Sequence, residues 1–320
     1  MRKIKKRYIL LSILGCLIMF MWFNNTNLFT QKQEDYKLLA HRGLAQTFDI
    51  SKVEWDTNTA EIIYEPEHDY LENTIQSMEV AFTYGADVVE LDIQRTKDNQ
   101  LAVFHDYDLS MRTEGEGVVS DYTMEELKQL DIGYRYTADN GKTYPFRGKG
   151  IGMMPELKEV LEAFPDKDLL IHMKDGDLET AKILWKYLEN MSPERLSQLT
   201  FYGNNEGLMY LREQNSSIRV LSMKLLKSAL IKYELLGWTG YIPEELHNME
   251  IHIPLKFAKY LWGWPHKFTK RMETVNTRVV IVEGDGKWSE GFDTIESLEK
   301  IPKGFNGYVW TNRIDRLAGK

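Results

Sequence analysis

Four side chains in the first third of the chain have the types and spacing that phosphate-ester chemistry requires: two carboxylates, Glu90 and Asp92, and two imidazoles, His41 and His105. Each lies at or near the end of an apolar, strand-like run. Residues two apart on a strand point to the same face, so Glu90 and Asp92 project together into an interior. Two buried carboxylates repel each other unless a cation lies between them. With two histidines able to move protons, the set suits metal-assisted cleavage of a phosphate ester.

Each of these groups also has a plainer interpretation. A Glu-x-Asp pair can be the solvent-facing side of an edge strand, and the spacing alone is a weak motif. A single histidine is more often a hydrogen-bonded structural residue than a catalyst. The functional interpretation depends on finding all four groups at strand ends within one stretch of the chain. Arg42, beside His41, adds a candidate phosphate ligand, because a guanidinium binds phosphate oxygens in two-point fashion.

The order of these motifs resembles that of the glycerophosphodiester phosphodiesterase family. The resemblance extends from residue 37 to the C-terminus and is dense over 37–175. The runs that carry it are H-R-G (41–43), E-N-T (72–74), G-A-D (85–87), E-L-D (90–92), T-K-D-N-Q (96–100), H-D (105–106), M-P-E-L-K-E-V-L (154–161) and G-Y-V-W-T-N-R-I-D-R-L (307–317). The resemblance implies a phosphoric diester hydrolase in which His41 and His105 exchange the roles of general base and acid. It also implies that Glu72 orients Arg42 or the first histidine, although Glu72 is equally explained as a favourable charge at a helix N-terminus.

The run LLIHMK at 169–174 departs from the family pattern. The family has Glu-x-Lys there, with the Glu as third metal ligand and the Lys near the phosphate. Lys174 is retained, but His172 replaces the Glu. We therefore expect one divalent cation held by Glu90, Asp92 and His172: Mg²⁺ or Ca²⁺ by resemblance, Mn²⁺ or Zn²⁺ because imidazole suits borderline metals. The alternatives are a non-ligand histidine with a water completing the shell, or a degraded site.

The N-terminal segment has the composition of a targeting sequence. Five of residues 2–7 are basic, and residues 8–23 carry no charge. Sixteen apolar residues are slightly fewer than the roughly 17–25 of a spanning helix. We interpret residues 1–30 as a cytoplasmic basic tail and transmembrane signal-anchor, with the barrel domain, 31–320, outside the cell. A cleaved signal peptide is the alternative. The only cysteine, Cys16, lies inside this segment, and a cysteine-free exported domain suits a bacterial cell surface.

The charge of the chain excludes some partners. The net charge is −8, and without the five basic residues of the tail 35 positive and 48 negative side chains remain, which is −13. So acidic a domain is a poor nucleic-acid binder. The same balance argues against tight adsorption to anionic lipid headgroups, despite the anchor.

The elements that must position these side chains alternate between strand and helix. Strand-like runs are expected at 37–41, 87–94, 101–105, 168–173, 199–203, 218–223, 249–253, 278–283 and 306–311. Helical patterns are expected at 73–84, 123–130, 155–164, 178–191, 205–214, 224–236 and 264–275. The alternation, the length and the polar residues at strand ends favour an α/β (βα)8 TIM-type barrel. A doubly wound open sheet is the alternative, but no Gly-rich phosphate loop follows the first strand. Two inserts, 44–71 and 131–153, are expected to be loops that either form walls or a lid of the site or are passive surface excursions.

The combined interpretation is metal-dependent hydrolysis of a glycerophosphodiester or of a glycerol-phosphate-containing surface polymer, such as teichoic acid or capsule. The second possibility is a phospholipase-D-like lyase or hydrolase acting on lysophospholipids. The third is a catalytically inactive barrel that binds glycerophosphate polymers. The expected partners are thus a phosphodiester, as a small molecule, lipid headgroup or polymer, and the membrane through the N-terminal helix.

Overall fold

The computed structural model describes residues 2–28, 36–285 and 290–317. Nine strands lie within these ranges, and all correspond to expected runs. They are β1 (Lys37–Ala40), β2 (Val88–Arg95), β3 (Leu101–Val103), β4 (Asp168–Met173), β5 (Leu199–Gly203), β6 (Arg219–Leu221), β7 (Glu250–Pro254), β8 (Arg278–Val282) and β9 (Tyr308–Thr311).

The helices between the strands include every one expected and several that were not. The α-helices are α1 (Arg2–Asn25), α2 (Ile75–Thr83), α3 (Met124–Leu127), α4 (Leu157–Ala163), α5 (Leu178–Leu188), α6 (Pro193–Gln198), α7 (Asn205–Gln214), α8 (Met223–Leu236), α9 (Leu255–Ala258), α10 (His266–Glu273), α11 (Ile295–Leu298) and α12 (Ile314–Leu317). The 3-10 helices are η1 (Ile50–Lys52), η2 (Thr59–Ile62), η3 (Leu109–Met111), η4 (Val119–Asp121), η5 (Gly237–Thr239) and η6 (Glu244–Leu246).

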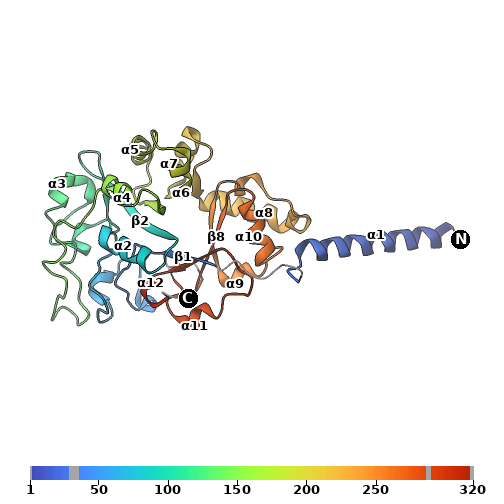
Figure 1. Ribbon diagram of the computed structural model, residues 1–320, viewed down its shortest axis with the longest axis horizontal. Coiled ribbons are helices and arrows are strands. Elements are labelled where there is room, and N and C mark those ends of the chain that lie inside the picture. Colours follow the sequence, from blue (N-terminus) through green and yellow to red (C-terminus); the bar gives the residue numbers. More distant parts are fainter. Residues whose placement is uncertain (1, 29–35, 286–289, 318–320) are drawn as a thin grey trace.

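Eight of the strands are parallel and form a nearly closed barrel surrounded by helices (Figure 1). Their spatial order is β6-β5-β4-β2-β1-β9-β8-β7. The gap between the first and last of these is crossed by one parallel bridge, Val220 to Met249, where the Val220 N–H donates to the Asn248 carbonyl at 3.2 Å. The expected TIM-type barrel is therefore confirmed, and the open doubly wound sheet is excluded.

The ninth strand, β3, is not part of the barrel. It turns back antiparallel on β2, with Ile93 opposite Val103. Immediately after it, the Phe104 N–H donates to the Asp92 carbonyl at 3.0 Å. This hairpin returns the chain to the level of Asp92, and it therefore places His105 beside the carboxylates of β2.

The helices begin where short polar side chains cap them. Thr123 and Glu126 form a capping box at α3, and Thr74 with Ser77 forms another at α2. In each, the side chain at the first position accepts from the backbone N–H three residues on, which satisfies an otherwise unpaired donor. Because these caps set the first turn of each helix, they also fix the loops that leave the strand ends.

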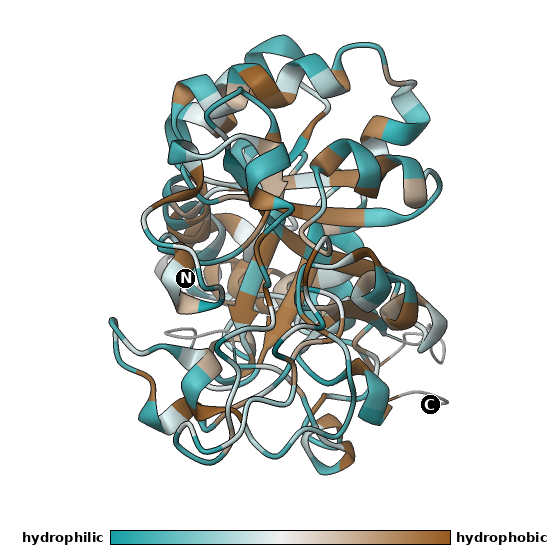
Figure 2. Cartoon of the chain, turned by 90° about the vertical axis from the view of Figure 1, so that its left-hand side faces the viewer, coloured by the Kyte–Doolittle hydropathy of each residue, from teal (hydrophilic) through white to brown (hydrophobic). Residues whose placement is uncertain are grey.

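The apolar residues separate into clusters inside and outside the barrel wall. Figure 2 shows hydrophobic strands at the centre and hydrophilic outer surfaces on the surrounding helices. The largest cluster fills the layer between strands and helices. A smaller one fills the barrel interior with Leu39, Val88, Leu170, Val280, Val282 and Trp310. The interior is thus packed, and polar side chains at the carboxyl ends of the strands lie on an apolar floor.

The two inserts form a structural unit of their own. Residues of 44–71 and of 104–153 share one buried cluster, which includes Leu71, Tyr136 and Phe146. Each of these three side chains is at most 2 % exposed. The inserts are therefore packed around a buried core, rather than being a passive surface excursion.

Helix α1 projects from the end of the domain opposite α3 (Figure 1). Its segment Lys6–Asn25 is long and apolar enough to cross a membrane, a property that a signal sequence near the N-terminus shares. The expected boundary between residues 30 and 31 lies outside the described residues.

Replacing a large side chain in the insert cluster tests whether it is a true core. Phe146 is fully buried and packs edge-on against Tyr136, with ring centroids 5.6 Å apart. Phe146→Ala should lower the free energy of unfolding by about 3–5 kcal/mol, because the cavity cannot be refilled. The measurement is urea unfolding, with the exposed Ile151→Ala of the same insert as a control within about 0.5 kcal/mol of the wild type. Equal effects of the two variants would show that the inserts contribute no core.

Candidate functional site

The candidate residues converge at the carboxyl ends of the first strands. His41 and Arg42 follow β1, and Glu90 and Asp92 lie on β2. His105 follows β3, while His172 lies on β4 and Lys174 just after it. In the β2–β4 ladder, Asp92 is the direct partner of His172. Parallel strands in register bring their polar residues to one mouth, so the expected site residues are assembled by the barrel itself.

The two carboxylates are fully buried, and each has defined partners. Glu90 accepts the backbone N–H of Arg42 at 3.1 Å through Oε2 and the hydroxyl of Tyr202 at 2.5 Å through Oε1. Asp92 accepts the amide of Asn73 at 3.0 Å through Oδ2. Its Oδ1 lies 2.8 Å from His172 Nδ1. The edge-strand interpretation is therefore wrong: both carboxylates face the interior.

Their pKa values shift in opposite directions. Burial raises the pKa of Glu90 to about 8, and the neighbouring Asp92 carboxylate adds to the rise. Burial also disfavours ionised Asp92, but His105 and Arg42 and the hydrogen bond with His172 hold its pKa well below the usual range. The pair thus keeps one negative charge firmly and the second weakly at neutral pH. One more nearby positive charge would ionise both.

The donor set fits a divalent cation. One ligand atom from each of Glu90, Asp92 and His172 lies within 4.8 Å of the other two. Two carboxylate oxygens and one imidazole nitrogen can bind Mg²⁺, Ca²⁺, Mn²⁺ or Zn²⁺, with the imidazole favouring the last two. His172 is also held in place, because its ring stacks on Tyr202 with centroids 3.9 Å apart and planes 9° apart. The structure thus brings the three expected ligands together.

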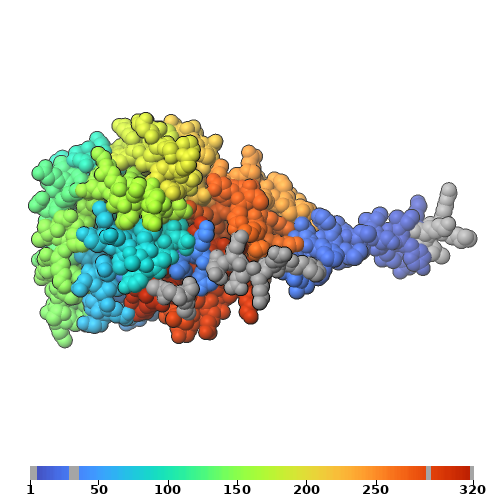
Figure 3. Space-filling model, in the orientation of Figure 1, coloured from blue at the N-terminus to red at the C-terminus, as the bar shows by residue number. Residues whose placement is uncertain are grey.

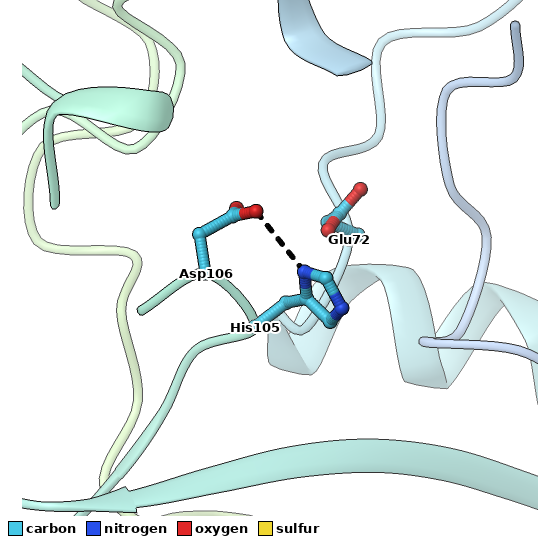
Figure 4. A group of neighbouring side chains, drawn as sticks. All are labelled: Glu72, His105 and Asp106. Atoms are coloured by element: carbon cyan, nitrogen blue, oxygen red, sulfur yellow. Dashed lines mark hydrogen bonds and ion pairs between the residues drawn. The ribbon is translucent and has the colours of Figure 1, made fainter. Parts of the chain in front are cut away.

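A second acidic group, Glu72, His105 and Asp106, lies beside the first (Figure 4). Its charges are already balanced. Glu72 Oε1 accepts Arg42 at 2.9 Å, and Asp106 Oδ2 accepts Arg112 Nε at 2.7 Å. A cation here would compete with two guanidinium groups, so the group is better suited to orienting side chains. Asp106 Oδ1 lies 3.1 Å from His105 Nδ1, which turns the other ring nitrogen of His105 away from Asp106.

His41 is oriented from the last strand of the barrel. Its Nδ1 lies 2.7 Å from Asn312 Oδ1, and the Asn312 amide donates to Asp293 at 3.0 Å. Because an amide oxygen can only accept, Nδ1 carries the proton and Nε2 keeps its lone pair. Nε2 is 3.9 Å from Glu90 Oε2. Burial, with repulsion from Arg42, holds the pKa of His41 well below its usual range, so the ring is neutral at pH 7.

A tight turn returns Arg42 into the site. Arg42 has φ 56° and Gly43 has φ 77°, both in the left-handed region. A Cβ on Gly43 would lie 2.6 Å from Ser77 Oγ, so only glycine fits between the turn and α2. The buried Arg42 Nε lies 3.3 Å from Asp92 Oδ2 but makes no hydrogen bond in the described structure. The turn therefore holds the guanidinium in ion pairs with Asp92 and Glu72.

Lys174 lies beside the open part of the site. A cavity of about 300 Å³ opens there, lined by His172, Lys174, Tyr107, Tyr202, Asn204, Leu221 and Met223 among others. Lys174 Nζ is 4.9 Å from the centre of the Tyr107 ring. Burial lowers the pKa of Lys174, although Asp92 opposes the shift. A cationic side chain thus faces a space large enough for a small phosphodiester.

Four further residues contact the expected ones. Asn73 and Asn312 lie inside motifs that the sequence displays, E-N-T and T-N-R, but their partners come from other strands. Tyr202 reaches Glu90 from β5, and Arg112 reaches Asp106 from the end of η3. No spacing relates either of these two to the motifs, so only the tertiary structure identifies them.

The chain is similar to known phosphodiesterases along most of its length. A model described as the glycerophosphoryl diester phosphodiesterase family matches residues 41–315. A glycerophosphodiester phosphodiesterase of Caldanaerobacter subterraneus is 36 % identical over 130 residues, which cover 41 % of this chain and 49 % of the relative. A lysophospholipase D of Mus musculus is 30 % identical over 206 residues, 62 % of each chain. The chain spans about half the length of the first curated relatives it matches.

Solved structures share the fold. A glycerophosphodiester phosphodiesterase of Agrobacterium tumefaciens has a TM-score of 0.57 at 19 % identity, covering 89 % of this chain and 100 % of its own. A phosphodiesterase of Oleispira antarctica, in complex with the product sn-glycerol-3-phosphate, has a TM-score of 0.54 at 20 % identity, covering 88 % and 95 %. At such identities the likeness supports the barrel fold alone.

The hydrogen bond between Asn312 and His41 allows a prediction of how activity depends on pH. Since the pKa of His41 is lowered, its base form persists below pH 6.5, and activity should fall only at lower pH. The Asn312 hydrogen bond raises that pKa, so Asn312→Ala should move the acidic limb of kcat/KM further down. The same variant should lower kcat about 10–100-fold, as loss of an orienting partner does. Steady-state rates across pH check both effects, and an unchanged limb would remove Asn312 from the positioning of His41.

Proposed function

Because the chain belongs to the glycerophosphoryl diester phosphodiesterase family, we propose that it hydrolyses a glycerophosphodiester at the carboxyl-terminal mouth of the barrel. The supporting observation is the convergence of His41 and His105, from separate strands, on the Glu90–Asp92–His172 cluster beside Arg42. That arrangement provides a neutral base, a second imidazole for the leaving group, and positive charge for the phosphate.

The proton path follows from the imidazoles. His41 Nε2 takes the proton from the attacking oxygen, which belongs to water or to a neighbouring hydroxyl of the substrate. The new P–O bond forms as the bond to the leaving alcohol breaks, and His105 supplies the proton that the departing oxygen needs. The two histidines exchange roles if a cyclic ester is then opened by water. The products are a phosphomonoester and an alcohol.

Charge on the phosphate is balanced by this chain's own cations. The Arg42 guanidinium lies at the site between Asp92 and Glu72 and supplies positive charge for the phosphate, and Lys174 faces the adjoining cavity. Glu72 holds the Arg42 guanidinium at 2.9 Å and so sets its direction. A divalent cation bound by Glu90, Asp92 and His172 would neutralise the carboxylate pair and draw electron density from phosphorus.

The substrate class has two candidates. Glycerol-phosphate units, free or in a surface polymer, are the first. The similarity to a lysophospholipase D favours lysophospholipid as the second. Phosphorus NMR of the reaction with soluble glycerophosphodiesters, a glycerol-phosphate polymer and a lysophospholipid tests both candidates. The first two substrates would release glycerol phosphate, whereas the lysophospholipid would release an acylated glycerol phosphate. A chain that binds these compounds and forms no product would be the inactive barrel.

Loss of either histidine should abolish most of the turnover. His41→Ala and His105→Ala should each lower kcat by roughly 10²–10⁴-fold, the usual contribution of general acid–base catalysis. Thermal unfolding should remain near that of the wild type. The exposed His247, just before β7, gives His247→Ala as a matched control with full activity. Wild-type turnover in either of the first two variants would exclude that histidine from the mechanism.

The role of His172 is tested by restoring the family's carboxylate. A protonated imidazole cannot ligate, whereas a carboxylate stays ionised down to about pH 4. His172→Glu should tighten binding of Mg²⁺ or Ca²⁺ relative to Zn²⁺ and extend activity to lower pH, and His172→Ala should weaken metal binding. Calorimetric titration with each metal measures this independently of turnover. Unchanged affinity in His172→Ala would make it a spectator.

We also propose that α1 anchors the domain at the outer face of a bacterial membrane as a single span, with its basic end in the cytoplasm. The length and apolar character of Lys6–Asn25 support an anchor or a signal sequence alike. Protease added to intact spheroplasts should digest the barrel domain. Protection until lysis would reverse the orientation, and recovery of a chain lacking α1 would indicate cleavage.

A further inference from the structure

The carboxyl end of α1 is fixed to the barrel domain by basic side chains. Lys267 Nζ donates to the carbonyls of Phe23 at 2.5 Å and of Asn24 at 3.2 Å. Arg271 donates to the Asn24 carbonyl at 2.9 Å. The last carbonyls of a helix lack partners in the helix and carry partial negative charge, so cations from α10 stabilise this end.

Side chains at the end of α1 add to this attachment. Asn24 and Asn25 both donate to the Trp238 carbonyl in η5, at 2.9 and 2.8 Å. Asn27 donates to the Trp264 carbonyl at 2.6 Å. Phe20 meets the Trp238 ring edge-on. The root of α1 is thus held on η5 and α10, and the helix leaves the domain in a defined direction (Figure 3).

Exposed apolar side chains lie near this root. Leu28 follows Asn27, and Leu235 and Leu236 precede η5. Tyr241 follows η5, and Tyr260 lies two residues before Trp262, whose indole donates to the last turn of α8. Leu28, Leu235 and Tyr260 are 75 %, 69 % and 66 % exposed. We call these five side chains the collar. Single exposed apolar residues are ordinary, but a group beside the root of an apolar helix indicates an apolar environment there.

The segment that contributes four of the five collar residues has a charge opposite to that of the domain as a whole. From residue 223 to 275 the chain has eight Lys or Arg and five Asp or Glu, although residues 8–320 together are strongly acidic. Lys259 lies 5.1 Å from the centre of the Tyr260 ring. Tyrosines and long basic side chains beside a membrane helix are the composition of a membrane–water interface, and Lys or Arg there attract anionic lipids.

We propose that the collar is a lipid-contact surface that rests in the headgroup layer of a membrane containing anionic lipid. The bilayer covers apolar side chains that the domain itself leaves exposed. The neighbouring lysines counter the repulsion between anionic headgroups and an acidic domain. The attachment of α1 through Lys267 and Arg271 keeps this face against the lipid. This inference goes beyond the proposed function, since it requires no catalysis.

Site-directed fluorescence on the full chain in vesicles tests the proposal. Cys16→Ala removes the only cysteine, and Leu235→Cys or Tyr260→Cys then places one label in the collar. Ile151→Cys and Tyr64→Cys are controls of similar exposure in the inserts. The vesicles contain phosphatidylcholine, a minority of phosphatidylglycerol, and a lipid quencher on the headgroup. Collar labels should be quenched at least about threefold more than the controls, because interfacial side chains lie within the ~5–10 Å boundary layer.

Three outcomes of the fluorescence experiment would contradict the proposal. Equal quenching at collar and insert positions, or failure of the chain to float with the vesicles, overturns it. Collar labels that are shielded equally in detergent and cross-link between chains would show that a second copy covers the face. Lys259→Glu should reduce collar quenching in the presence of phosphatidylglycerol and leave hydrolysis of a soluble diester unchanged. Loss of hydrolysis in the parent chain would concern the proposed function alone.

Discussion

The structure of the site depends on burying two carboxylates two residues apart on one strand. Glu90 and Asp92 repel each other in a medium that screens little, and without positive charge one of them would stay protonated. Their surroundings answer this requirement. The turn at Arg42 and Gly43 brings a guanidinium and a backbone N–H to the pair. His172 supplies an imidazole in register with Asp92. A divalent cation would supply the positive charge that is still needed to balance both carboxylates.

A second group of charged side chains surrounds the Glu90–Asp92 pair and holds its neighbours in place. Glu72 and Asp106 are carboxylates that hold Arg42 and His105 in place, and they would themselves be unbalanced without Arg112. Arg112 is 3 % exposed and lies over the ring of Tyr136 in the insert cluster, 5.1 Å from the ring centre. The hydrophobic cluster shared by the two inserts therefore supports the candidate site. It positions Arg112, which holds Asp106, and Asp106 in turn orients His105.

Strand positions, the barrel and the set of convergent residues could be predicted because each depends on local pattern or on strand-end geometry. What escaped prediction depends on register or on long-range packing. Tyr202 reaches Glu90 only because β5 lies beside β4 in one register. Helices as short as α9 and α11, four residues each, carry too little periodicity to detect. The hairpin of β3 looked like another barrel strand, since an antiparallel return has the same composition.

Helix α8 connects the cavity of the candidate site with the collar, so its length sets the distance between them. Met223, at its start, lines the cavity beside Lys174, and Leu235, near its end, belongs to the collar. Figure 1 shows α8 extending towards the end of the domain from which α1 projects. Fourteen residues at ~1.5 Å each make α8 about 21 Å long. With the collar among headgroups, α8 acts as a spacer that holds the mouth far above the bilayer. To reach the mouth, a lipid would have to leave the bilayer and expose its acyl chains to water, which costs about 0.8 kcal/mol per CH₂. Under the two proposals, the distance between mouth and bilayer would therefore favour a soluble diester or a polymer strand over a lipid in the membrane.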